Sequence, residues 1–324
     1  MIVTSKFSPS WWLSNPHLQT IVASKLARPT KTTSKAERTE LSDGDFLDLN
    51  FSLKTSGPVV CLLHGLAGCI NSAYIQGVFS SLENAGFRPV LMHWRGCSGE
   101  PNRLSRAYHS GASDDVELFV NLMVERFPGE SVYAVGYSLG GNALLKYLGE
   151  QADATPLAGA MAVCPPLVLA VGAEKFDQGL TRGYQRYLLG QMRIQHEAKR
   201  MRYPELDLPA ATPMLDNFWK FDDTITAPLH GFDDVHDYYD RCSARQFLPF
   251  IQRPTRILYA LDDPFFTPAV LPEAGELAES VTLELSTHGG HVGFLGQTQP
   301  GSKTTTRWLD LHVADVIAGM HNSA

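Results

Sequence analysis

Ser138 lies between two glycines in the sequence AVGYSLGG. An apolar run over 131–137 precedes it, and a segment with helical periodicity over 139–149 follows it, so we expect the serine at a tight turn from a strand into a helix. Side chains two residues away would crowd such a turn, and Gly136 and Gly140 remove them. The free N–H groups of a helix N-terminus favour negative charge. The pattern therefore indicates a serine nucleophile above the edge of a sheet.

A serine hydroxyl is a weak nucleophile and needs a histidine base that an acid orients. At a strand-turn-helix serine of this kind, the order along the chain is serine, acid, histidine, with the last two after late strands. The strand expected at 255–261 ends in DDPFF, and Asp263, which precedes Pro264, is the preferred acid. The strand expected at 281–286 is followed by THGGHVGF, where His291 comes after two glycines and is the preferred base.

Two neighbours of these residues allow other interpretations. Asp262 is a candidate helper of the preferred acid, and His288 is closer to the strand and expected to be structural. The HGGH sequence could also be a pair of metal ligands. It lacks the HExxH helical pattern and a third ligand, so we expect no metal and no organic cofactor.

The negative charge that develops on an ester oxygen needs two backbone donors. One is expected to be the N–H of Leu139, directly after the nucleophile. The other is expected from the HGLAG loop after the strand at 58–64, where Leu66 is the candidate donor and Gly65 allows close approach. Losing one such donor typically slows an enzyme by a factor of about one hundred or more.

The elements that must position these residues alternate along the chain. Strands are expected at 46–53, 58–64, 87–94, 131–137, 158–164, 255–261 and 281–286, and helices before Gly86, at 114–127, at 139–149, between 261 and 281, and at 304–320. This alternation predicts an α/β fold, with a mostly parallel central sheet and helices on both faces.

The alternation is interrupted once, which predicts three parts. We expect a core at 41–165 and 253–324, a helical cap insertion at 166–252 and an irregular N-terminal extension at 1–40 that packs on the core. The insertion is too long for an ordinary connection, and it follows a strand whose carboxyl end lies where ligands bind in such folds. Within the extension, Trp11, Trp12 and a helix at 17–27 could contact lipid, but packing on the core is preferred.

Residues that could contact a substrate come from several loops. The expected pocket residues are Gly65, Leu66, Phe265, Phe266 and Phe294, a set that suits an acyl group. Arg95 could hold a carboxylate or phosphate of the substrate. An ion pair with Asp222 or Asp223 of the cap is the preferred interpretation of this arginine.

Charge and composition exclude several classes of protein. With 27 Lys and Arg against 34 Asp and Glu, the chain has a formal charge of −7, which argues against nucleic-acid binding. Five cysteines without a CxxC pair are typical of reduced thiols in a cytoplasmic protein. The uncharged run at 156–173 is broken by Pro165 and Pro166, and the N-terminus has no signal-peptide pattern. We therefore expect a soluble, cytoplasmic chain without an integral membrane segment.

The sequence resembles the α/β-hydrolase superfamily and, within it, the YheT-like esterases, bacterial relatives of the abhydrolase-domain proteins. The motifs that carry the resemblance are NPHLQT (15–20), LLHGLAG (62–68), HWRGCSG (93–99), YHSG (108–111), GYSLGG (136–141), FDDTITAPLHGF (221–232), DDPFF (262–266) and GGHVGF (289–294). They span nearly the whole chain. In that family the elbow serine, the DDP acid and the GGH histidine form the catalytic triad, which here implies Ser138, Asp263 and His291. Larger relatives carry an N-terminal membrane anchor, and no such helix is expected here.

The resemblance and the residues together predict a serine hydrolase that cleaves carboxylic esters through an acyl-enzyme. The partner would be a small-molecule ester, acyl or lipid-like. A thioesterase, lipase or amidase with the same triad, or a non-catalytic binding protein that keeps the fold, are the alternatives. A lipid-surface protein that uses Trp11 and Trp12 is a further one.

Overall fold

The structure is a computed structural model that describes residues 1–26, 29, 31–297 and 304–323. Its centre is a sheet in the order β1-β9-β8-β7-β6-β4-β5-β3-β2. The strands are β1 (Ile2–Thr4), β2 (Ser34–Glu40), β3 (Phe46–Ser52), β4 (Val59–Leu63), β5 (Arg88–His93), β6 (Val132–Tyr137), β7 (Gly159–Val163), β8 (Thr255–Ala260) and β9 (Val281–Ser286). All neighbouring strands in this sheet are parallel except that β3 is antiparallel to both β2 and β5. The α/β class predicted from the alternation is thus the observed one.

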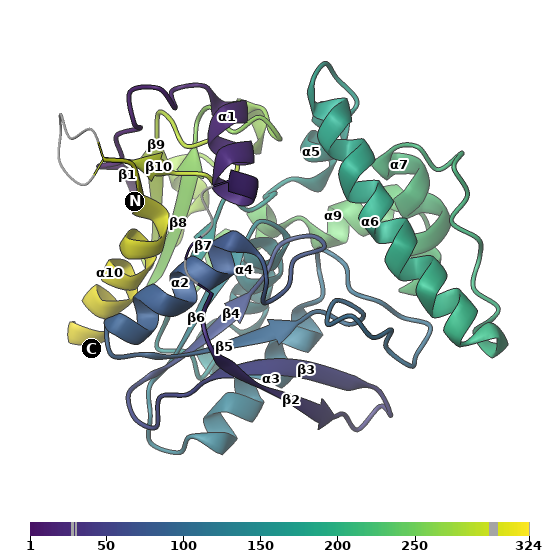
Figure 1. The fold of residues 1–324 in the computed structure, drawn as a ribbon, viewed down its shortest axis with the longest axis horizontal. Helices are drawn as coiled ribbons and strands as arrows, with labels where there is room; N and C mark the ends of the chain where they lie inside the picture. The colour runs from purple at the N-terminus through teal and green to yellow at the C-terminus, as the bar shows by residue number, and fades with distance from the viewer. Residues whose placement is uncertain (27–28, 30, 298–303, 324) are drawn as a thin grey trace.

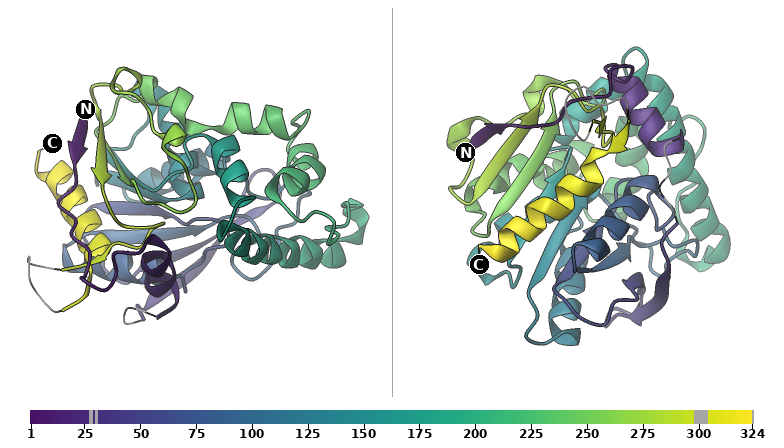
Figure 2. Two further views of the ribbon diagram at one scale, coloured as in Figure 1. Left: turned by 90° about the horizontal axis from the view of Figure 1, so that it is seen from above. Right: turned by 60° about the vertical axis from the view of Figure 1, so that its left-hand side comes forward.

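Helices cover both faces of the sheet. The core helices are α2 (Ala73–Asn84), α3 (Ser113–Arg126), α4 (Leu139–Gln151) and α10 (Trp308–Asn322). The central strand β4 is buried along its whole length, and its side chains alternate between the two faces. Val60 and Leu62 belong to the cluster of α2 and α10, which lie side by side (Figure 2), and Cys61 belongs to the cluster of α3 and α4. Continuous apolar strands of this kind are typical of a parallel sheet with helices on each side.

The long connection between β7 and β8 forms a helical layer of its own. It contains α5 (Leu169–Phe176), α6 (Thr181–Arg202), α7 (Phe218–Phe221), a π-helix (Asp222–Thr226), α8 (Ala227–Leu229) and α9 (Val235–Cys242), with 3₁₀ turns at Pro204–Leu206 and Ala244–Phe250. Figure 1 shows these helices together on one side of the sheet, with both termini on the opposite side. The helix α1 (Pro16–Ile21) is continued by a π-helix (Val22–Leu26), and Nδ1 of His17 in α1 lies 3.2 Å from the hydroxyl of Tyr184 in this layer.

The N-terminal segment is more regular than its sequence indicates. Residues 1–40 were expected to be irregular, but β1 pairs in parallel with β9 at one edge of the sheet, and β2 pairs with β3 at the other. The helix expected at 17–27 is present as α1 and its π-helical continuation, and Ala27 lies outside the described residues. Within the described part of the chain, no helix is long and apolar enough to cross a membrane.

One expected helix is wrong. Between β8 and β9 the chain forms only two 3₁₀ turns, Pro268–Val270 and Ala274–Glu276. Pro264, Pro268 and Pro272 follow one another at intervals of four residues, and each removes a donor that a helix needs. A small antiparallel pair, β10 (Leu295–Gly296) and β11 (Thr306–Arg307), and a 3₁₀ turn at Ala152–Ala154 complete the described elements.

Candidate active site

Ser138 lies at the turn between β6 and α4. Its backbone has φ 51° and ψ −118°, a conformation that non-glycine residues rarely adopt. The flanking glycines make this turn possible. A Cβ on Gly136 would lie 2.4 Å from the carbonyl oxygen of Gly140, and a Cβ on Gly140 would lie 2.5 Å from that of Leu63. Ser138 is thus held in a strained turn at the N-terminus of α4.

The structure brings the three residues singled out above into one hydrogen-bonded chain. Nε2 of His291 lies 3.0 Å from Oγ of Ser138, and Nδ1 of His291 lies 2.8 Å from Oδ2 of Asp263. The Asp263 side chain is almost completely buried, and its other oxygen accepts a hydrogen bond of 2.9 Å from the N–H of Phe265. A serine, an imidazole and a buried carboxylate in this order can move a proton from the hydroxyl to the histidine.

The loop that carries His291 is fastened to α1. The N–H of His291 donates to Oγ1 of Thr20 over 2.9 Å. Gly290 precedes the histidine with φ 59°, and a Cβ there would lie 2.5 Å from the carbonyl oxygen of Pro16. The NPHLQT motif therefore supports the histidine, a role that could not be derived from the sequence alone.

Asp262 and His288 lie beside this chain but outside it. Asp262 accepts a 2.9 Å hydrogen bond from the N–H of Gly290, and its second oxygen lies 3.3 Å from Nδ1 of His288. Burial raises the pKa of Asp262. Both residues therefore hold the turn that presents His291, which fits the structural role expected for His288.

The two expected backbone donors have free N–H groups. Neither Leu66 nor Leu139 donates its N–H to another described residue. Gly65 allows its loop to approach the serine, because a Cβ there would lie 3.2 Å from Cβ of Ser138. The loop and the N-terminus of α4 thus lie against each other around the serine.

His64 fixes one peptide of this loop. Burial lowers the pKa of His64 to about 3, so its ring is neutral at ordinary pH. Nε2 accepts a 3.2 Å hydrogen bond from the N–H of Trp94, so Nδ1 carries the proton and donates to the carbonyl oxygen of Gly65 over 2.7 Å. In a trans peptide the C=O and the N–H point in opposite directions, so anchoring this oxygen also sets the direction of the Leu66 N–H.

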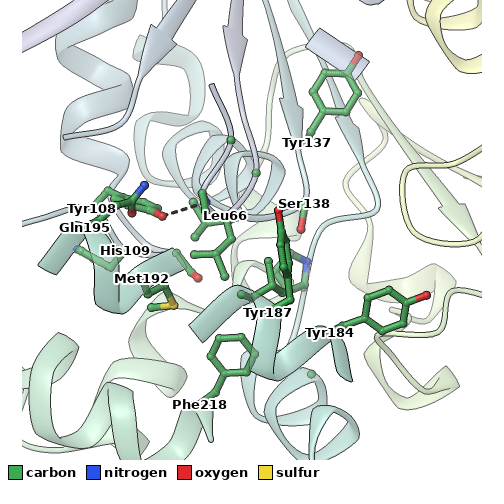
Figure 3. Close-up of a pocket in the computed structure, with 18 of the residues that line it drawn as sticks. Leu66, Tyr108, His109, Tyr137, Ser138, Tyr184, Tyr187, Met192, Gln195 and Phe218 are labelled. Atoms are coloured by element: carbon green, nitrogen blue, oxygen red, sulfur yellow. Dashed lines mark hydrogen bonds between the residues drawn. The ribbon is translucent and has the colours of Figure 1, made fainter. Parts of the chain in front are cut away.

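A cavity of about 660 Å³ opens between Ser138 and the helical layer (Figure 3). Gly65, Leu66, Phe265 and Phe266 line it together with Ser138 and His291. The helical layer adds mainly apolar and aromatic side chains, among them Phe176, Leu188, Met192, Phe218 and Ile225. Figure 3 shows Tyr184, Tyr187, Met192 and Phe218 around Ser138.

Phe294 was expected in this pocket, and that expectation is wrong. Its side chain is fully buried. The centroid of its ring lies 5.2 Å from that of Phe7 and 6.0 Å from that of Trp308. The backbone of Phe294 has φ 46°, which continues the tight turn after His291 and directs the ring into the core. The sequence could not show this, because it gives no sign of how far the loop turns.

Comparison with known proteins agrees with this geometry. The profile of the family described as "alpha/beta hydrolase fold" matches residues 58–297. The chain belongs to the α/β-hydrolase family. It is 39% identical over 319 residues to "Putative esterase YheT" of Escherichia coli (strain K12). The matched region covers 96% of this chain and 93% of that protein. The resemblance to YheT-like esterases is therefore confirmed.

More distant relatives extend the comparison. The hydrolase is 28% identical over 307 residues to "Phospholipase ABHD3" of Mus musculus, which covers 91% of this chain and 74% of that protein. Among solved structures it superposes on the esterase Pf2001 of Pyrococcus furiosus with a TM-score of 0.56, over 100% of this chain and 98% of that chain, at 13% identity. At that identity the match shows the fold alone.

Arg95 of the hydrolase has different partners from those expected. Its Nη1 lies 2.9 Å from Oδ2 of Asp45 and 3.0 Å from Oδ2 of Asp43, and its Nη2 lies 2.8 Å from Oδ1 of Asp115. The predicted pair with Asp222 or Asp223 is therefore wrong. The guanidinium is fully buried and already bound by carboxylates, so it is not available to a substrate anion.

Possible metal ligands of the hydrolase coincide with residues already described. Within the described residues, one group of three could offer ligand atoms to an ion: Cys164, Asp263 and His291, whose atoms lie within 4.8 Å of one another. His291 uses both ring nitrogens on Ser138 and Asp263, which leaves it no lone pair for a cation while these hydrogen bonds are kept. The HGGH pair does not converge on a site of this kind, because His288 is not a member of the group.

Proposed function

We propose that this α/β hydrolase is a serine esterase that cleaves carboxylic esters (EC 3.1.1.-). The observation that carries the proposal is the hydrogen-bonded chain from Ser138 through His291 to Asp263, with distances of 3.0 Å and 2.8 Å. The same order of groups activates a hydroxyl nucleophile in hydrolases of unrelated folds. The names of its relatives, an esterase and a phospholipase, support an ester as the substrate.

Each proposed step uses groups of this chain. His291 takes the proton of Ser138 as Oγ attacks the ester carbonyl, and the N–H groups of Leu66 and Leu139 bind the oxyanion. Protonated His291 then gives the proton to the leaving alcohol, and an acyl-enzyme remains. Water, deprotonated by the same histidine, releases the acid and restores Ser138. Asp263 holds the imidazole in the required tautomer and stabilises its positive charge.

The cavity supports an acyl group as the part of the substrate that is bound. Apolar side chains of the helical layer face the serine across it, and burying a methylene among them contributes about 0.8 kcal/mol. We retain the division of the chain predicted above, with a cap at 166–252 over a core at 41–165 and 253–324. The extension at 1–40 supplies β1, β2 and α1 to the same structure.

We also propose a cytoplasmic location. All five cysteines are free thiols in the structure, and four of them are buried. Free thiols are usual where the surroundings are reducing.

The test is a comparison of initial rates on p-nitrophenyl esters from acetate to palmitate. Wild type, Ser138→Ala and the control Ser24→Ala, which removes another hydroxyl from the cavity wall, are measured side by side. We expect wild type and control to hydrolyse at least part of the series and Ser138→Ala to be slower by a factor of about 10⁴ or more. Equal rates for wild type and Ser138→Ala on every ester would refute the proposal. A Ser138-dependent activity confined to thioesters or amides would instead assign one of the other acyl hydrolases.

A further inference from the structure

The loop that carries the Leu66 N–H has its two neighbouring N–H groups occupied by tyrosines. The N–H of Gly65 donates to the hydroxyl of Tyr74 over 2.9 Å, and the N–H of Ala67 donates to the hydroxyl of Tyr108 over 3.0 Å. Figure 3 shows the Tyr108 hydroxyl with its hydrogen bond beside Leu66. Of three consecutive N–H groups, the central one alone is free to bind a ligand.

The two tyrosines reach the loop from separate elements that are themselves fixed. Tyr74 is in the first turn of α2, and its ring centroid lies 4.8 Å from that of Tyr137. Tyr108 is in the connection between β5 and α3, and its ring stacks on Trp94 with centroids 6.3 Å apart and planes 15° apart. The hydroxyls are therefore held on both sides of the loop by side chains that have little freedom to move.

Both hydroxyls are suited to accept these hydrogen bonds. Burial raises the pKa of Tyr74 and of Tyr108, so each phenol keeps its proton and offers oxygen lone pairs to an N–H. Gly68 makes room for one of them, because a Cβ on Gly68 would lie 2.7 Å from the hydroxyl oxygen of Tyr74. The loop sequence HGLAG is thus matched to a tyrosine on each side.

The loop conformation needs such support. Ala67 has φ 52°, in the left-handed region that costs a non-glycine residue on the order of 1 kcal/mol or more. The hydrogen bond to Tyr108 is made by the N–H of this same residue. Without it, the strained residue would be free to relax, and the adjoining peptide with the Leu66 N–H would turn with it.

We propose that Tyr74 and Tyr108 are positioning residues for ester hydrolysis: they hold the peptides on either side of the Gly65–Leu66 peptide, so that the Leu66 N–H points at the developing oxyanion. This inference rests on the proposed function. Neither tyrosine exchanges a proton with the substrate. Complete loss of an oxyanion donor costs about a hundredfold or more in kcat, so a donor that is only misdirected should cost about tenfold.

The test compares Tyr74→Phe and Tyr108→Phe with Tyr147→Phe. Tyr147 is the matched control because it is also buried and its hydroxyl has a hydrogen-bond partner in Thr155. We measure kcat and KM on a p-nitrophenyl ester that wild type hydrolyses, and the inhibition constant of a trifluoromethyl ketone, whose adduct with the serine carries the oxyanion. Rates are normalised to active sites titrated with a fluorophosphonate, so unfolded molecules do not count.

We expect kcat to fall about tenfold in each tyrosine variant with KM within twofold of wild type, and the inhibition constant to rise by the same factor as kcat/KM falls. A structural role alone would lower the melting temperature but leave both quantities of the folded enzyme unchanged. The inference is wrong if both variants match Tyr147→Phe in kcat and in ketone affinity while Ser138→Ala is inactive. If Ser138→Ala has the same kcat as wild type, the proposed function is wrong, and the inference that rests on it is wrong as well. Either tyrosine variant decides the question if the other does not fold, because each holds a different peptide.

Discussion

The ring of Phe265 stacks on the imidazole of His291, with centroids 4.1 Å apart and planes 27° apart. The same residue donates its backbone N–H to Asp263, so one short loop orients both the acid and the face of the base. Its ring also meets Tyr184 of α6 at a centroid distance of 5.0 Å. Phe265 therefore contacts both the helical layer, through Tyr184, and the imidazole of His291.

Phe265→Ala should reduce kcat by about tenfold or more, because the imidazole loses the surface that keeps it in line with Ser138 and small displacements of a reacting group are costly. Phe265→Leu keeps most of the packing, so its kcat should lie between those of Phe265→Ala and wild type. The measurement is kcat per titrated active site on the best p-nitrophenyl ester. Phe250→Ala, at a residue that is 57% exposed, serves as the control and should match wild type. A kcat for Phe265→Ala equal to that of the control would show that the ring only fills space.

Two glycines in helices should respond to the same substitution in opposite directions. A Cβ on Gly140 would meet the backbone oxygens of Leu63 and His64 at 2.5 Å and 2.7 Å, whereas a Cβ on Gly190 of α6 has no atom within 4 Å. Gly140→Ala should therefore lower the free energy of unfolding by several kcal/mol or abolish folding, since the clash is with backbone. Gly190→Ala should raise it by about 0.5–1 kcal/mol because alanine is the better helix former. Urea unfolding of both variants checks the pair, and a stable Gly140→Ala with normal kcat would contradict the account of the turn.

The parts of the site that could be predicted from the sequence are those fixed by local chemistry and by strand order. The strained turn at Ser138 needs small residues on both sides, so the GxSxG spacing predicts it. Parallel strands end at one edge of a sheet, so acids and histidines after β8 and β9 had to lie near it. Asp263 and His291 are the acid and the histidine predicted on this ground, and the structure brings both to Ser138.

The parts that could not be predicted depend on contacts between distant segments. The three-residue strand β1 is too short to show a period, and its place is set by pairing with β9. The sequence offers many aspartates as possible partners of Arg95, and its partner Asp45 lies 50 positions earlier in the chain. The roles of Tyr74 and Tyr108 come from hydroxyls that meet one loop from two elements. A pattern within one segment does not indicate contacts of this kind between distant segments.

Replacing Arg95 should destabilise the protein far more than replacing a surface arginine. Arg95→Leu would remove the guanidinium that the buried carboxylates of Asp45 and Asp115 share, and breaking a buried pair in this way typically costs about 3–5 kcal/mol. Arg241→Leu removes an exposed pair with Asp237 and should cost about 0.5 kcal/mol or less. Urea unfolding at neutral pH measures both, and equal losses would show that the buried cluster does not stabilise the fold.

Asp222 should make stability depend on pH in a defined direction. Its side chain accepts hydrogen bonds from the hydroxyls of Thr226 and Tyr239, and burial raises its pKa from 3.8 to about 6. Between these two values the folded protein keeps a proton that the unfolded chain has lost. The contribution of this group to stability is therefore fully present below pH 4 and is lost as pH rises to about 6.

Asp222→Asn removes this titration without removing the side chain's volume. The free energy of unfolding of the variant, minus that of wild type, should rise with pH between about 4 and 6 and then level off, with a total change of up to about 3 kcal/mol. Urea unfolding of both proteins at half-unit steps from pH 4 to pH 8 gives this difference, and the shared titrations of all other groups cancel in it. A difference that stays constant across the range would mean that Asp222 is ionised in the folded protein. Its two hydroxyl partners would then be stabilising a buried carboxylate rather than binding a neutral acid.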